Sequence, residues 1–509
     1  MIVRLEGDGT LAQRLYRGLR GAILDGRIAP RSRLPSTRSL AKELGLSRNV
    51  VLAAFDELIG EGYVSARVGS GTYVSGSMPD VVAPRPPASG PAPSPAPVVR
   101  LSAQAQRALS LRSFPVPGTS PQGRWLPWDF RYGQSAPEDF PHALWSRLVA
   151  RRARSLSVRT LWYGRTRGYM PLREAIVSHL RRARGVVASV DRVIIVSGTQ
   201  QALDLVARLL VDRGERVVIE EPSYLAARQV FLAAGAKLVP VTVDGQGLDV
   251  SCLPKSGSVR LAFLTPSHQF PLGSVMPLDR RLELLRWAEA SGAHVIEDDY
   301  DAEFRYDGSP LPAMQGMDHG GRVIYIGSFS KVMFPSLRIG YLVVPPALVP
   351  GVVALKFLSD VHSPTFEQEV LAEFMAEGHF ERHLRRAAAR NASRRAALLA
   401  AFAEHFGDRV EIVGARAGVH VVAWLNDVRP RDLPALVERA ALGGVGIYPV
   451  TPYFLRPPGR AGLLVGYTSL KESEIRGGVR ALAGVMGRAT APPPADAERV
   501  PSRAVPRPG

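Results

Sequence analysis

Two periodicities of apolar residues divide the chain into two parts. From residue 10 to residue 24, apolar side chains recur every four positions, which predicts an amphipathic helix. These positions are Leu11, Leu15, Leu19 and Ile23. Further along, short β-branched runs alternate with helical patterns, which predicts a mostly parallel sheet with helices on both faces. The runs lie at 193–196, 217–219, 259–264, 294–296, 323–326 and 339–344. The pattern therefore predicts a small helical unit and a large α/β unit.

The segment after the first helix predicts two more short helices joined by a tight turn. Ser36 can cap a helix that ends near Leu44. Gly45 supplies a turn with positive φ, and Ser47 can cap a second helix that runs to about Gly60. Two short helices joined by a turn that contains glycine form a helix-turn-helix.

A hairpin pattern with glycines at its tip follows over residues 62–74, which completes an α+β winged helix-turn-helix. The ordered motifs Leu-Pro-Ser-x-Arg, Leu-Ser-Arg-Asn-Val, Gly-Tyr-Val and Gly-Ser-Gly-Thr-Tyr-Val closely resemble the GntR family of bacterial repressors over residues 10–75. The resemblance implies double-stranded operator DNA as a partner. The DNA contacts that it implies are Arg38, Ser47, Arg48, Asn49 and the wing at Gly69.

Composition changes sharply near residue 76. Proline and alanine dominate residues 84–97, which is typical of an extended, semi-rigid linker. The end of the chain has a similar composition. We therefore expect four parts: a winged helix-turn-helix domain at 1–75, a Pro/Ala-rich linker at 76–125, an α/β domain at 126–487 and a disordered tail at 488–509.

The chemistry of the large unit centres on a lysine that follows a buried strand. Lys331 ends the sequence Gly-Ser-Phe-Ser-Lys, directly after the apolar run 322–326. A desolvated lysine close to other cations has a depressed pKa and can attack an aldehyde. The hydroxyls of Ser328 and Ser330 and the guanidinium of Arg338 can hold a phosphate beside it. A lysine with a phosphate clamp predicts pyridoxal phosphate.

Other strand ends carry groups that suit the same cofactor. Thr199 and Gln200 open a helix whose free backbone amides favour an anion, so both are phosphate candidates. The ring of Tyr224 can stack on a flat cofactor. Asp298 lies in Glu-Asp-Asp-Tyr-Asp, where a carboxylate can keep a pyridine nitrogen protonated and the Tyr300 hydroxyl can reach the phenolic oxygen of the ring. The alternative interpretation of this run is a solvated acidic loop.

Asp298, Tyr300 and Lys331, in this order and each at a strand end, resemble the fold-type I aminotransferases over about residues 128–487. The resemblance implies a Schiff base between Lys331 and pyridoxal phosphate. It also implies a homodimer, because the family tyrosine that matches Tyr163 reaches the cofactor phosphate of the neighbouring subunit. A GntR-like domain, a proline-rich linker and an aminotransferase-like domain in this order resemble the MocR/GabR subfamily of transcription regulators. That resemblance implies a sensor for an amine, an amino acid or the cofactor itself.

Two positions depart from the pattern of working aminotransferases. Phe270 stands where the asparagine of Asn-Pro-x-Gly touches the cofactor, and Leu464 stands where an arginine grips the substrate carboxylate. Arg456 and Arg460 lie nearby in sequence and are candidates to replace that arginine. We therefore expect a regulator rather than a physiological enzyme. A catalytic aminotransferase with an accessory DNA-binding domain, and a plain repressor that has lost the cofactor, remain as alternatives.

Composition bears on partners and compartment. The 64 basic and 46 acidic side chains give a net charge of +18, which suits a polyanionic partner. Residues 1–75 carry 11 basic and 7 acidic side chains, so most of the excess lies elsewhere. The single cysteine, Cys252, excludes a disulfide and a cysteine-based metal site within one chain, and we expect no metal. The sequence shows no signal peptide and no apolar run of membrane length, so we expect a cytoplasmic protein.

Overall fold

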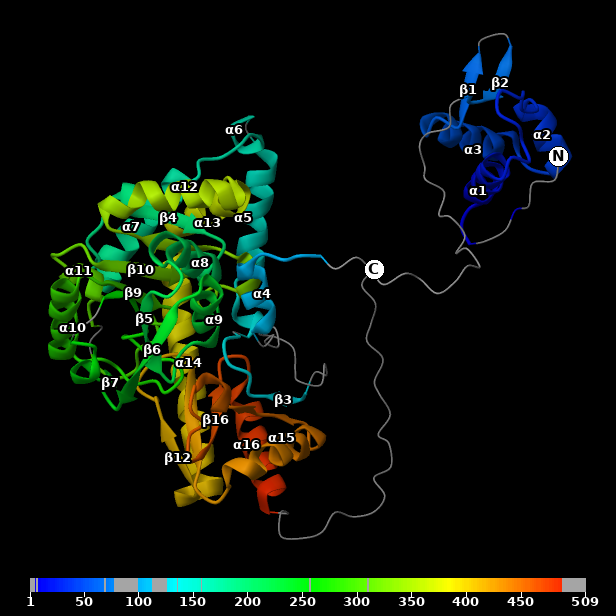
Figure 1. Ribbon diagram of the computed structural model, residues 1–509. Coiled ribbons are helices and arrows are strands. Elements are labelled where there is room, and N and C mark those ends of the chain that lie inside the picture. The colour runs from blue at the N-terminus through cyan, green and yellow to red at the C-terminus, as the bar shows by residue number, and fades with distance from the viewer. Residues whose placement is uncertain are drawn as a thin grey trace. The chain divides into compact units, whose positions relative to one another are not determined.

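The computed structural model describes residues 5, 8–67, 70–76, 99–111, 126–134, 136–156, 158–255, 258–308 and 311–487. The chain forms two compact units, Met1–Val99 and Arg100–Gly509 (Figure 1). Gly69 of the predicted wing, residues 77–98 and 112–125 of the predicted linker, and the predicted tail lie outside the described residues.

The first unit packs three helices against a two-stranded hairpin. Its elements are α1 (Leu11–Leu24), α2 (Thr37–Leu44), α3 (Arg48–Gly60), β1 (Val64–Arg67) and β2 (Gly71–Val74). The strands pair antiparallel, with Val64 opposite Val74. Leu15, Leu19 and Ile23 of α1 are buried in its core, whereas Leu11 is 46% exposed. The apolar stripe of α1 therefore begins one turn later than the sequence pattern predicts.

The helix-turn-helix forms as its capping residues predict. Ser36 accepts a hydrogen bond from the backbone N–H of Ser39 at 3.1 Å, and Ser47 accepts one from Val50 at 3.4 Å. Gly45 ends α2 with φ +66°, in the left-handed region that glycine adopts without strain. Local signals thus set both helix starts and the turn between them.

A mixed sheet of eight strands forms the centre of the second unit within the described residues. The strands are β4 (Val193–Val196), β5 (Arg216–Glu221), β6 (Lys237–Asp244), β7 (Gly247–Leu248), β8 (Val259–Leu264), β9 (His294–Asp299), β10 (Val323–Ser328) and β11 (Gly340–Val343). Their order is β4-β11-β10-β9-β8-β5-β6-β7. The pairs from β10 to β6 are parallel, and β11 runs antiparallel to both of its neighbours. The predicted strands are all present.

Helices cover both faces of this sheet because its strands alternate apolar side chains between the faces. Val193 and Ile195 of β4 pack with one group of helices, and Ile194 and Val196 pack with the other. The first group contains α5 (His142–Arg154), α7 (Met170–Arg184) and α13 (Thr365–Ala376). The second contains α8 (Thr199–Leu210), α9 (Leu225–Ala234) and α12 (Val349–Asp360). Helices α10 (Leu278–Ser291) and α11 (Met314–Met317) pack in a further cluster with side chains of β5 to β10, and α6 (Val158–Leu161) follows α5.

The long helix α14 (His379–Phe406) leads into a smaller subdomain with its own sheet (Figure 1). That sheet has the order β12-β13-β16-β15, and all of its pairs are antiparallel. The elements are β12 (Val410–Val413), β13 (His420–Leu425), β15 (Tyr448–Pro449), β16 (Ala461–Gly466), α15 (Leu433–Leu442) and α16 (Glu472–Gly487). Strand β14 (Val445–Gly446) pairs with β3 (Trp128–Asp129), which brings the start of the aminotransferase-like region against this subdomain.

One part of the predicted linker is helical rather than extended. Ala103–Ser110 forms α4, which Ser102 caps by accepting from the N–H of Ala105 at 3.2 Å. Arg107 Nε donates to the Ala233 carbonyl at 3.0 Å, so α4 lies against the end of α9. Alanine and glutamine favour helix, and this contact supplies the tertiary support that a short helix needs.

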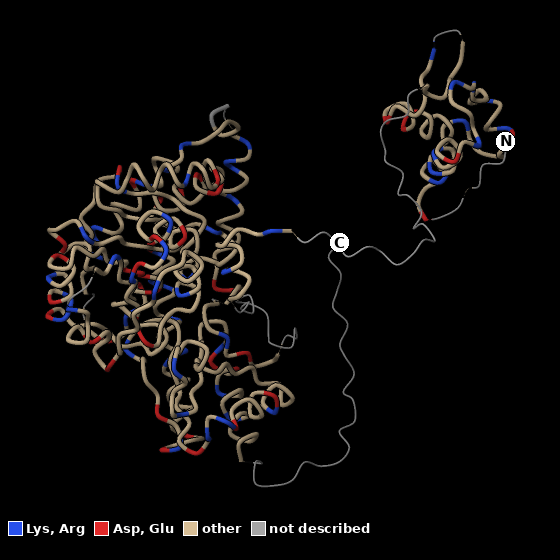
Figure 2. The backbone as a smooth tube through the Cα atoms, in the orientation of Figure 1, with Lys and Arg blue, Asp and Glu red and all other residues tan. Residues whose placement is uncertain are grey.

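Basic side chains are distributed over both units (Figure 2). Among the helices that the structure describes, none is long and apolar enough to cross a bilayer.

Candidate functional site

The predicted cofactor residues gather at the carboxyl ends of the central strands. Lys331 follows β10, Asp298 lies near the end of β9, and Thr199 follows β4. The carboxyl ends of neighbouring parallel strands meet at one edge of a sheet, which is where α/β folds bind ligands.

The Lys331 side chain is closely packed between the end of β10 and the loop that contains Tyr132 and Gly133. Its Nζ donates to the Gly133 carbonyl at 3.0 Å and lies 5.0 Å from the centroid of the Tyr132 ring. Gly133 has φ +84°, and a Cβ there would lie 2.5 Å from Nζ. The segment that precedes α5 thus approaches the lysine closely at a glycine whose positive φ would strain other residues.

The pKa of Lys331 is lowered to about 8, because burial disfavours the charged amine. The carboxylates of Asp301 and Asp298 oppose this shift, and the guanidinium of Arg338 adds to it. The amine is therefore partly neutral near physiological pH, which is the form that attacks an aldehyde.

The acidic run 297–301 is buried, so it is not a solvated loop. Three of its four carboxylates have specific partners. Glu297 accepts from the backbone amides of Met314 and Gln315, Asp299 from Arg184 and Tyr325, and Asp301 from His268. Buried carboxylates persist only when they are paired in this way.

Asp298 is the exception in this run. It is 4% exposed, and its Oδ1 has no hydrogen-bond partner among the described residues. Burial raises the pKa of Asp298 to about 8, and the charges of Asp299 and Asp301 add to the shift. A buried carboxyl oxygen without a partner suits a cationic group, and the protonated ring nitrogen of pyridoxal phosphate is such a group. The residues present thus fit this cofactor.

Arg338 lies at the start of helix α8. Its Nη2 donates to the Ser197 carbonyl at 2.7 Å, and a Cβ at Gly198 would lie 2.9 Å from the same nitrogen. Thr199 and Gln200 are the first two residues of α8. The structure therefore brings Arg338, Thr199 and Gln200 to one helix N-terminus.

The two predicted serines belong to the loop that carries Lys331. The Ser328 hydroxyl accepts from the backbone N–H of Ser330 at 3.1 Å. Both side chains are partly exposed. They lie on the turn from β10 to the lysine, where their hydroxyls can also reach an anion.

Two tyrosines flank the site, and one of them has a different partner from the expected one. Tyr224 begins α9, and burial raises its pKa to about 12 while Arg338 opposes the shift. The Tyr300 hydroxyl donates to the His268 carbonyl at 3.0 Å and lies 3.1 Å from His268 Nδ1. In this structure the hydroxyl of Tyr300 is therefore held by a loop of the protein.

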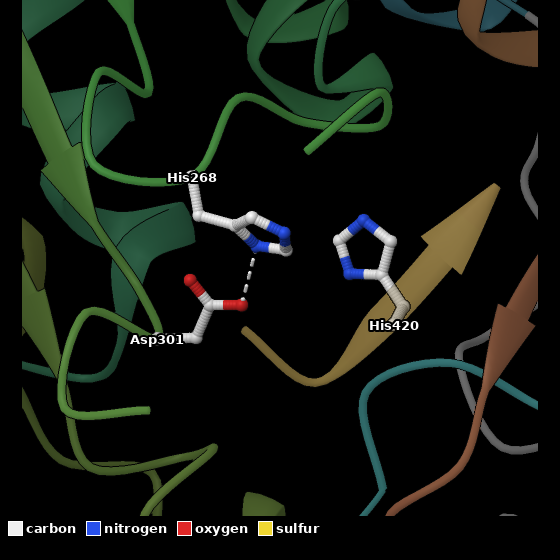
Figure 3. A group of neighbouring side chains, drawn as sticks. All are labelled: His268, Asp301 and His420. Atoms are coloured by element: carbon white, nitrogen blue, oxygen red, sulfur yellow. Dashed lines mark hydrogen bonds and ion pairs between the residues drawn. The ribbon is translucent and has the colours of Figure 1, made fainter. Parts of the chain in front are cut away.

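His268, Asp301 and His420 form a buried group that the sequence analysis did not single out (Figure 3). His268 Nδ1 donates to Asp301 at 2.9 Å. His420 Nε2 donates to the Pro271 carbonyl at 3.0 Å, which leaves its Nδ1 without a partner among the described residues. His268 lies in the Thr-Pro-Ser-His-Gln-Phe-Pro loop, so the motif was visible in the sequence, but its contact with His420 was not.

The three side chains offer ligand atoms within 4.8 Å of one another, so they could hold a metal ion. Hydrogen bonds already give all three a structural role. The His268–Asp301 pair positions the backbone to which Tyr300 donates, and His420 supports the loop at Pro271.

A ring of aromatic side chains surrounds Phe270, which is 1% exposed. We call Phe270 and its ring neighbours the Phe270 box. The neighbours, with centroid distances of 4.9 to 6.1 Å, are Tyr132, Tyr224, Tyr300, His420 and Tyr453. Phe270 itself brings no hydrogen-bonding side chain to this side of the site.

The candidates for the missing carboxylate clamp do not enter the box. Leu464 is 1% exposed and packs in the same cluster as Phe270. Arg460 donates to Glu411 at 2.6 Å, with half of its side chain exposed. The side chain of Arg456 is exposed.

Tyr163 lies apart from the site within one chain. It is 87% exposed, and its ring contacts that of His362 at 6.0 Å, beyond the end of α12. Its neighbours Leu161 and Trp162 are 70% and 73% exposed.

The predicted DNA contacts cluster on α2 and at the start of α3. Arg38, Ser47, Arg48 and Asn49 are all exposed. Ser47 also caps α3, so Arg48 and Asn49 stand in the first turn of the helix that would enter a groove.

Two family models match the chain. Residues 11–74 match the bacterial regulatory proteins of the gntR family. Residues 141–440 match the aminotransferases of class I and II.

Several regulators are similar to the chain. The probable rhizopine catabolism regulatory protein MocR of Rhizobium meliloti is 38% identical over 95% of this chain and 95% of that protein. The transcriptional regulator TauR of Rhodobacter capsulatus is 36% identical over 72% of this chain and 75% of that protein. The pyridoxine biosynthesis transcriptional regulator PdxR of Corynebacterium glutamicum is 31% identical over 72% of this chain and 73% of that protein.

Solved aminotransferases resemble the second unit. The α-aminoadipate aminotransferase LysN of Thermus thermophilus, in complex with N-(5'-phosphopyridoxyl)-L-leucine, has a TM-score of 0.66 and 31% identity, covering 71% of this chain and 92% of that protein. The kynurenine aminotransferase of Pyrococcus horikoshii, in complex with PMP, has a TM-score of 0.69 and 27% identity, covering 77% of this chain and 98% of that protein.

Proposed function

The chain belongs to the MocR-type transcription regulators, which join a gntR-family DNA-binding domain to an aminotransferase domain, and we propose that it regulates transcription according to what occupies a pyridoxal phosphate site. The unpaired, buried carboxyl oxygen of Asp298 carries the proposal, because it calls for a cationic partner close to Lys331. When bound, pyridoxal phosphate supplies a protonated ring nitrogen and an aldehyde that condenses with amines.

Each predicted cofactor residue has one task in this proposal. Asp298 would hold the ring nitrogen, Tyr224 would pack on the ring, and the partly neutral amine of Lys331 would meet the aldehyde. The Tyr300 hydroxyl would hold the phenolic oxygen. The phosphate is held by Thr199, Gln200, Ser328, Ser330 and Arg338.

The protein acts as a homodimer in this proposal. An exposed apolar surface, which we call the α6–α12 patch, supports it. The patch consists of Leu161, Trp162, Tyr163, Phe357 and Leu358, whose exposed fractions run from 54% to 87%. Exposed apolar surfaces of this kind mark protein interfaces. A second copy that covers the patch would bring Tyr163 to the phosphate of its neighbour.

The gntR-family domain binds DNA, and we propose that it reads an operator with two half-sites. Arg38, Ser47, Arg48, Asn49 and the wing at Gly69 make the contacts. The effector is an amine, an amino acid or the cofactor itself. It changes transcription because it binds two arrangements of the dimer with different affinity. The protein acts in the bacterial cytoplasm, where its DNA target lies.

The cofactor site is tested by absorption spectroscopy of the full-length protein. We expect a visible band after addition of pyridoxal phosphate to the wild type, and none with Lys331→Ala. Lys237→Ala removes an exposed lysine on β6 and serves as the matched control, which keeps the band. A wild type without a band would refute the cofactor proposal and leave a plain repressor.

The DNA site is tested with operator fragments selected from a random pool. Arg48→Ala should weaken binding by about tenfold or more, because it removes a contact at the helix start. The control Arg27→Ala changes an exposed arginine outside the helix-turn-helix and should leave affinity unchanged. Rapid, sustained transamination with no effect of any amine on DNA affinity would favour the catalytic alternative.

A further inference from the structure

The Phe270 box and its surroundings determine which ligands can enter beside Lys331. The Lys331 amine lies 5.0 Å from the Tyr132 ring, so the box directly borders the reactive position. An ordinary amino acid brings its carboxylate to such a position, and aminotransferases meet it with an arginine. Whether this site can bind a carboxylate therefore depends on the partners of the arginines around it.

Arg228 is the arginine of helix α9, four residues after Tyr224, and it is 5% exposed. Its Nη1 donates to the Tyr453 carbonyl at 3.1 Å, and its Nη2 donates to the Pro452 carbonyl at 2.8 Å. The guanidinium thus holds the backbone of the loop that supplies Tyr453. Both terminal nitrogens of Arg228 are thus committed to backbone carbonyls rather than to a ligand.

The arginine nearest in sequence to Leu464 is also committed elsewhere. Arg460 donates to Glu411 at 2.6 Å and to Asn426 at 3.1 Å. Its guanidinium carbon lies 5.2 Å from the Trp424 ring centroid. Leu464 itself fills the clamp position with an apolar side chain.

The guanidinium of Arg131 is also bonded to groups of the protein. It forms a salt bridge with Asp129 at 2.7 Å and donates to the Tyr448 hydroxyl at 3.0 Å. Its Nη1 has no partner within the described part of the chain. Its charge is already paired with Asp129, so a ligand carboxylate would have to compete with Asp129 for it.

Acidic groups lie beside the box together with two cations, Lys331 and Arg338, which the proposed function assigns to the aldehyde and to the phosphate. Asp301, Asp298 and Glu220 all add to the rise in the pKa of Tyr300, which places their charges near its hydroxyl. A ligand carboxylate would be buried there without a cation of its own, which is costly. A cationic or neutral amine meets aromatic faces and hydroxyls instead, which favour it.

We infer that the effector of this site is an amine without an α-carboxylate. The inference rests on the proposed function, because it concerns the ligand that meets Lys331 and its cofactor. Recognition comes from the rings of the Phe270 box and from hydroxyls of its tyrosines, and not from a charged clamp.

The test compares ligand pairs that differ by one carboxylate. Full-length protein loaded with pyridoxal phosphate is titrated with tyramine and tyrosine, histamine and histidine, putrescine and ornithine, and agmatine and arginine. The visible spectrum and the affinity for selected operator DNA are both measured. We expect the amine of at least one pair to act at a concentration at least about tenfold lower than its amino acid, and no pair to show the reverse.

A gain-of-function variant tests the position of the missing clamp. Leu464→Arg should lower the concentration of each amino acid that gives a half-maximal response, relative to that of its amine, by about tenfold or more. The charge-matched control Leu442→Arg, at an 87% exposed position on α15, should leave the preference unchanged. If Leu464→Arg fails to fold, the wild-type titrations still decide the matter.

Two results would overturn the inference. One is an amino acid that acts at the same concentration as its amine or a lower one; loss of that response in Arg131→Gln would then locate the carboxylate site. The other is that no amine changes either the visible spectrum or the affinity for operator DNA. If a protein loaded with the cofactor gives either result, only the inference about the effector fails. If the visible band does not form at all, the proposed function itself fails.

Discussion

Adjacent side chains in the acidic run have different chemical roles because each meets a different neighbour. Glu297 and Asp299 are tied to the framework of the large sheet, and Asp301 is tied to the His268 loop. Asp298 and Asp299 each keep a buried Oδ1 without a partner among the described residues, but the other oxygen of Asp299 accepts from Arg184 and Tyr325. Asp298 is therefore the carboxylate of this run that the protein framework does not hold, as the proposed cofactor site requires.

Asp298→Asn should stabilise the cofactor-free protein increasingly as the pH rises. The folded pKa of Asp298 is about 8, whereas an unfolded aspartate titrates near about 4. Between these values the folded state keeps a proton that the unfolded state has lost, so wild-type stability falls as pH rises to about 8. Asparagine does not titrate, so the variant should gain on the order of a few kcal/mol over the wild type across this range.

Thermal unfolding of both cofactor-free proteins at pH 5, 6.5 and 8 measures this gain. A difference in midpoint that stays constant across the series would contradict the pKa assignment. The same variant should also bind pyridoxal phosphate more weakly, because an amide cannot balance a protonated ring nitrogen.

The Lys331 amine should set the pH dependence of cofactor capture. Its pKa is about 8, and the neutral amine is the reactive form. The rate at which the visible band develops should rise about tenfold per pH unit below pH 8 and level off above it. Stopped-flow absorbance measures this profile, and a rate that is flat between pH 6 and pH 8 would contradict it.

At the scale of elements, hydrogen bonds next to the site connect the segment after β9 of the large sheet to the loop before β13 of the smaller sheet. The Gly418 amide is bonded to the Phe304 carbonyl, and the Gly418 carbonyl accepts from the hydroxyls of Tyr306 and Tyr467. The His268–Asp301 pair lies against the same glycine. The loop before β13 thus holds the His268–Asp301 pair in place, and the hydrogen bond from the Tyr300 hydroxyl to the His268 carbonyl depends on that pair.

Gly418→Ala should destabilise the second unit by roughly 2–4 kcal/mol. Gly418 has φ +80°, and a Cβ there would overlap the His268 ring. Gly459→Ala is the matched control, because a Cβ at Gly459 has no described atom within 4 Å. Chemical denaturation followed by far-UV circular dichroism compares the variants, and equal effects at the two glycines would contradict the packing argument.

At the scale of the whole molecule, the α6–α12 patch is the surface that one chain leaves incomplete. Tyr163 contacts His362 at its edge, so the segment after α6 and the end of α12 form one continuous surface. Trp162 and Leu358 are 73% and 76% exposed, which is unusual for large apolar side chains in a single folded chain. In the proposed homodimer, the patch would link the oligomeric state to cofactor binding through Tyr163.

Leu358→Glu should convert a wild-type dimer into a monomer at micromolar concentration, because it buries a charge in the proposed interface. We expect the dimer dissociation constant to rise by about 100-fold or more. Light scattering coupled to gel filtration measures the mass, and Leu442→Glu on α15 serves as the control that stays dimeric. A wild type that is monomeric under these conditions would contradict the homodimer proposal.

Much of the fold follows from local signals in the sequence. The caps at Ser36 and Ser47, the turn at Gly45 and the β-branched runs act over a few residues, so they predict elements without knowledge of the rest of the chain. The same signals placed Lys331 and Asp298 at strand ends. The helix at Ala103–Ser110 was missed because its stability depends on a contact with α9, far away in the sequence.

The sequence by itself thus determined the two kinds of domain, their order and which residues stand at the strand ends. Tertiary structure decided how those residues are partnered. It joined His268 to Asp301 and His420, gave Arg228 to the loop at Tyr453, and left Asp298 unpaired. The reason is physical: element formation depends on near neighbours, whereas pairing, burial and pKa depend on groups that only the folded chain brings together.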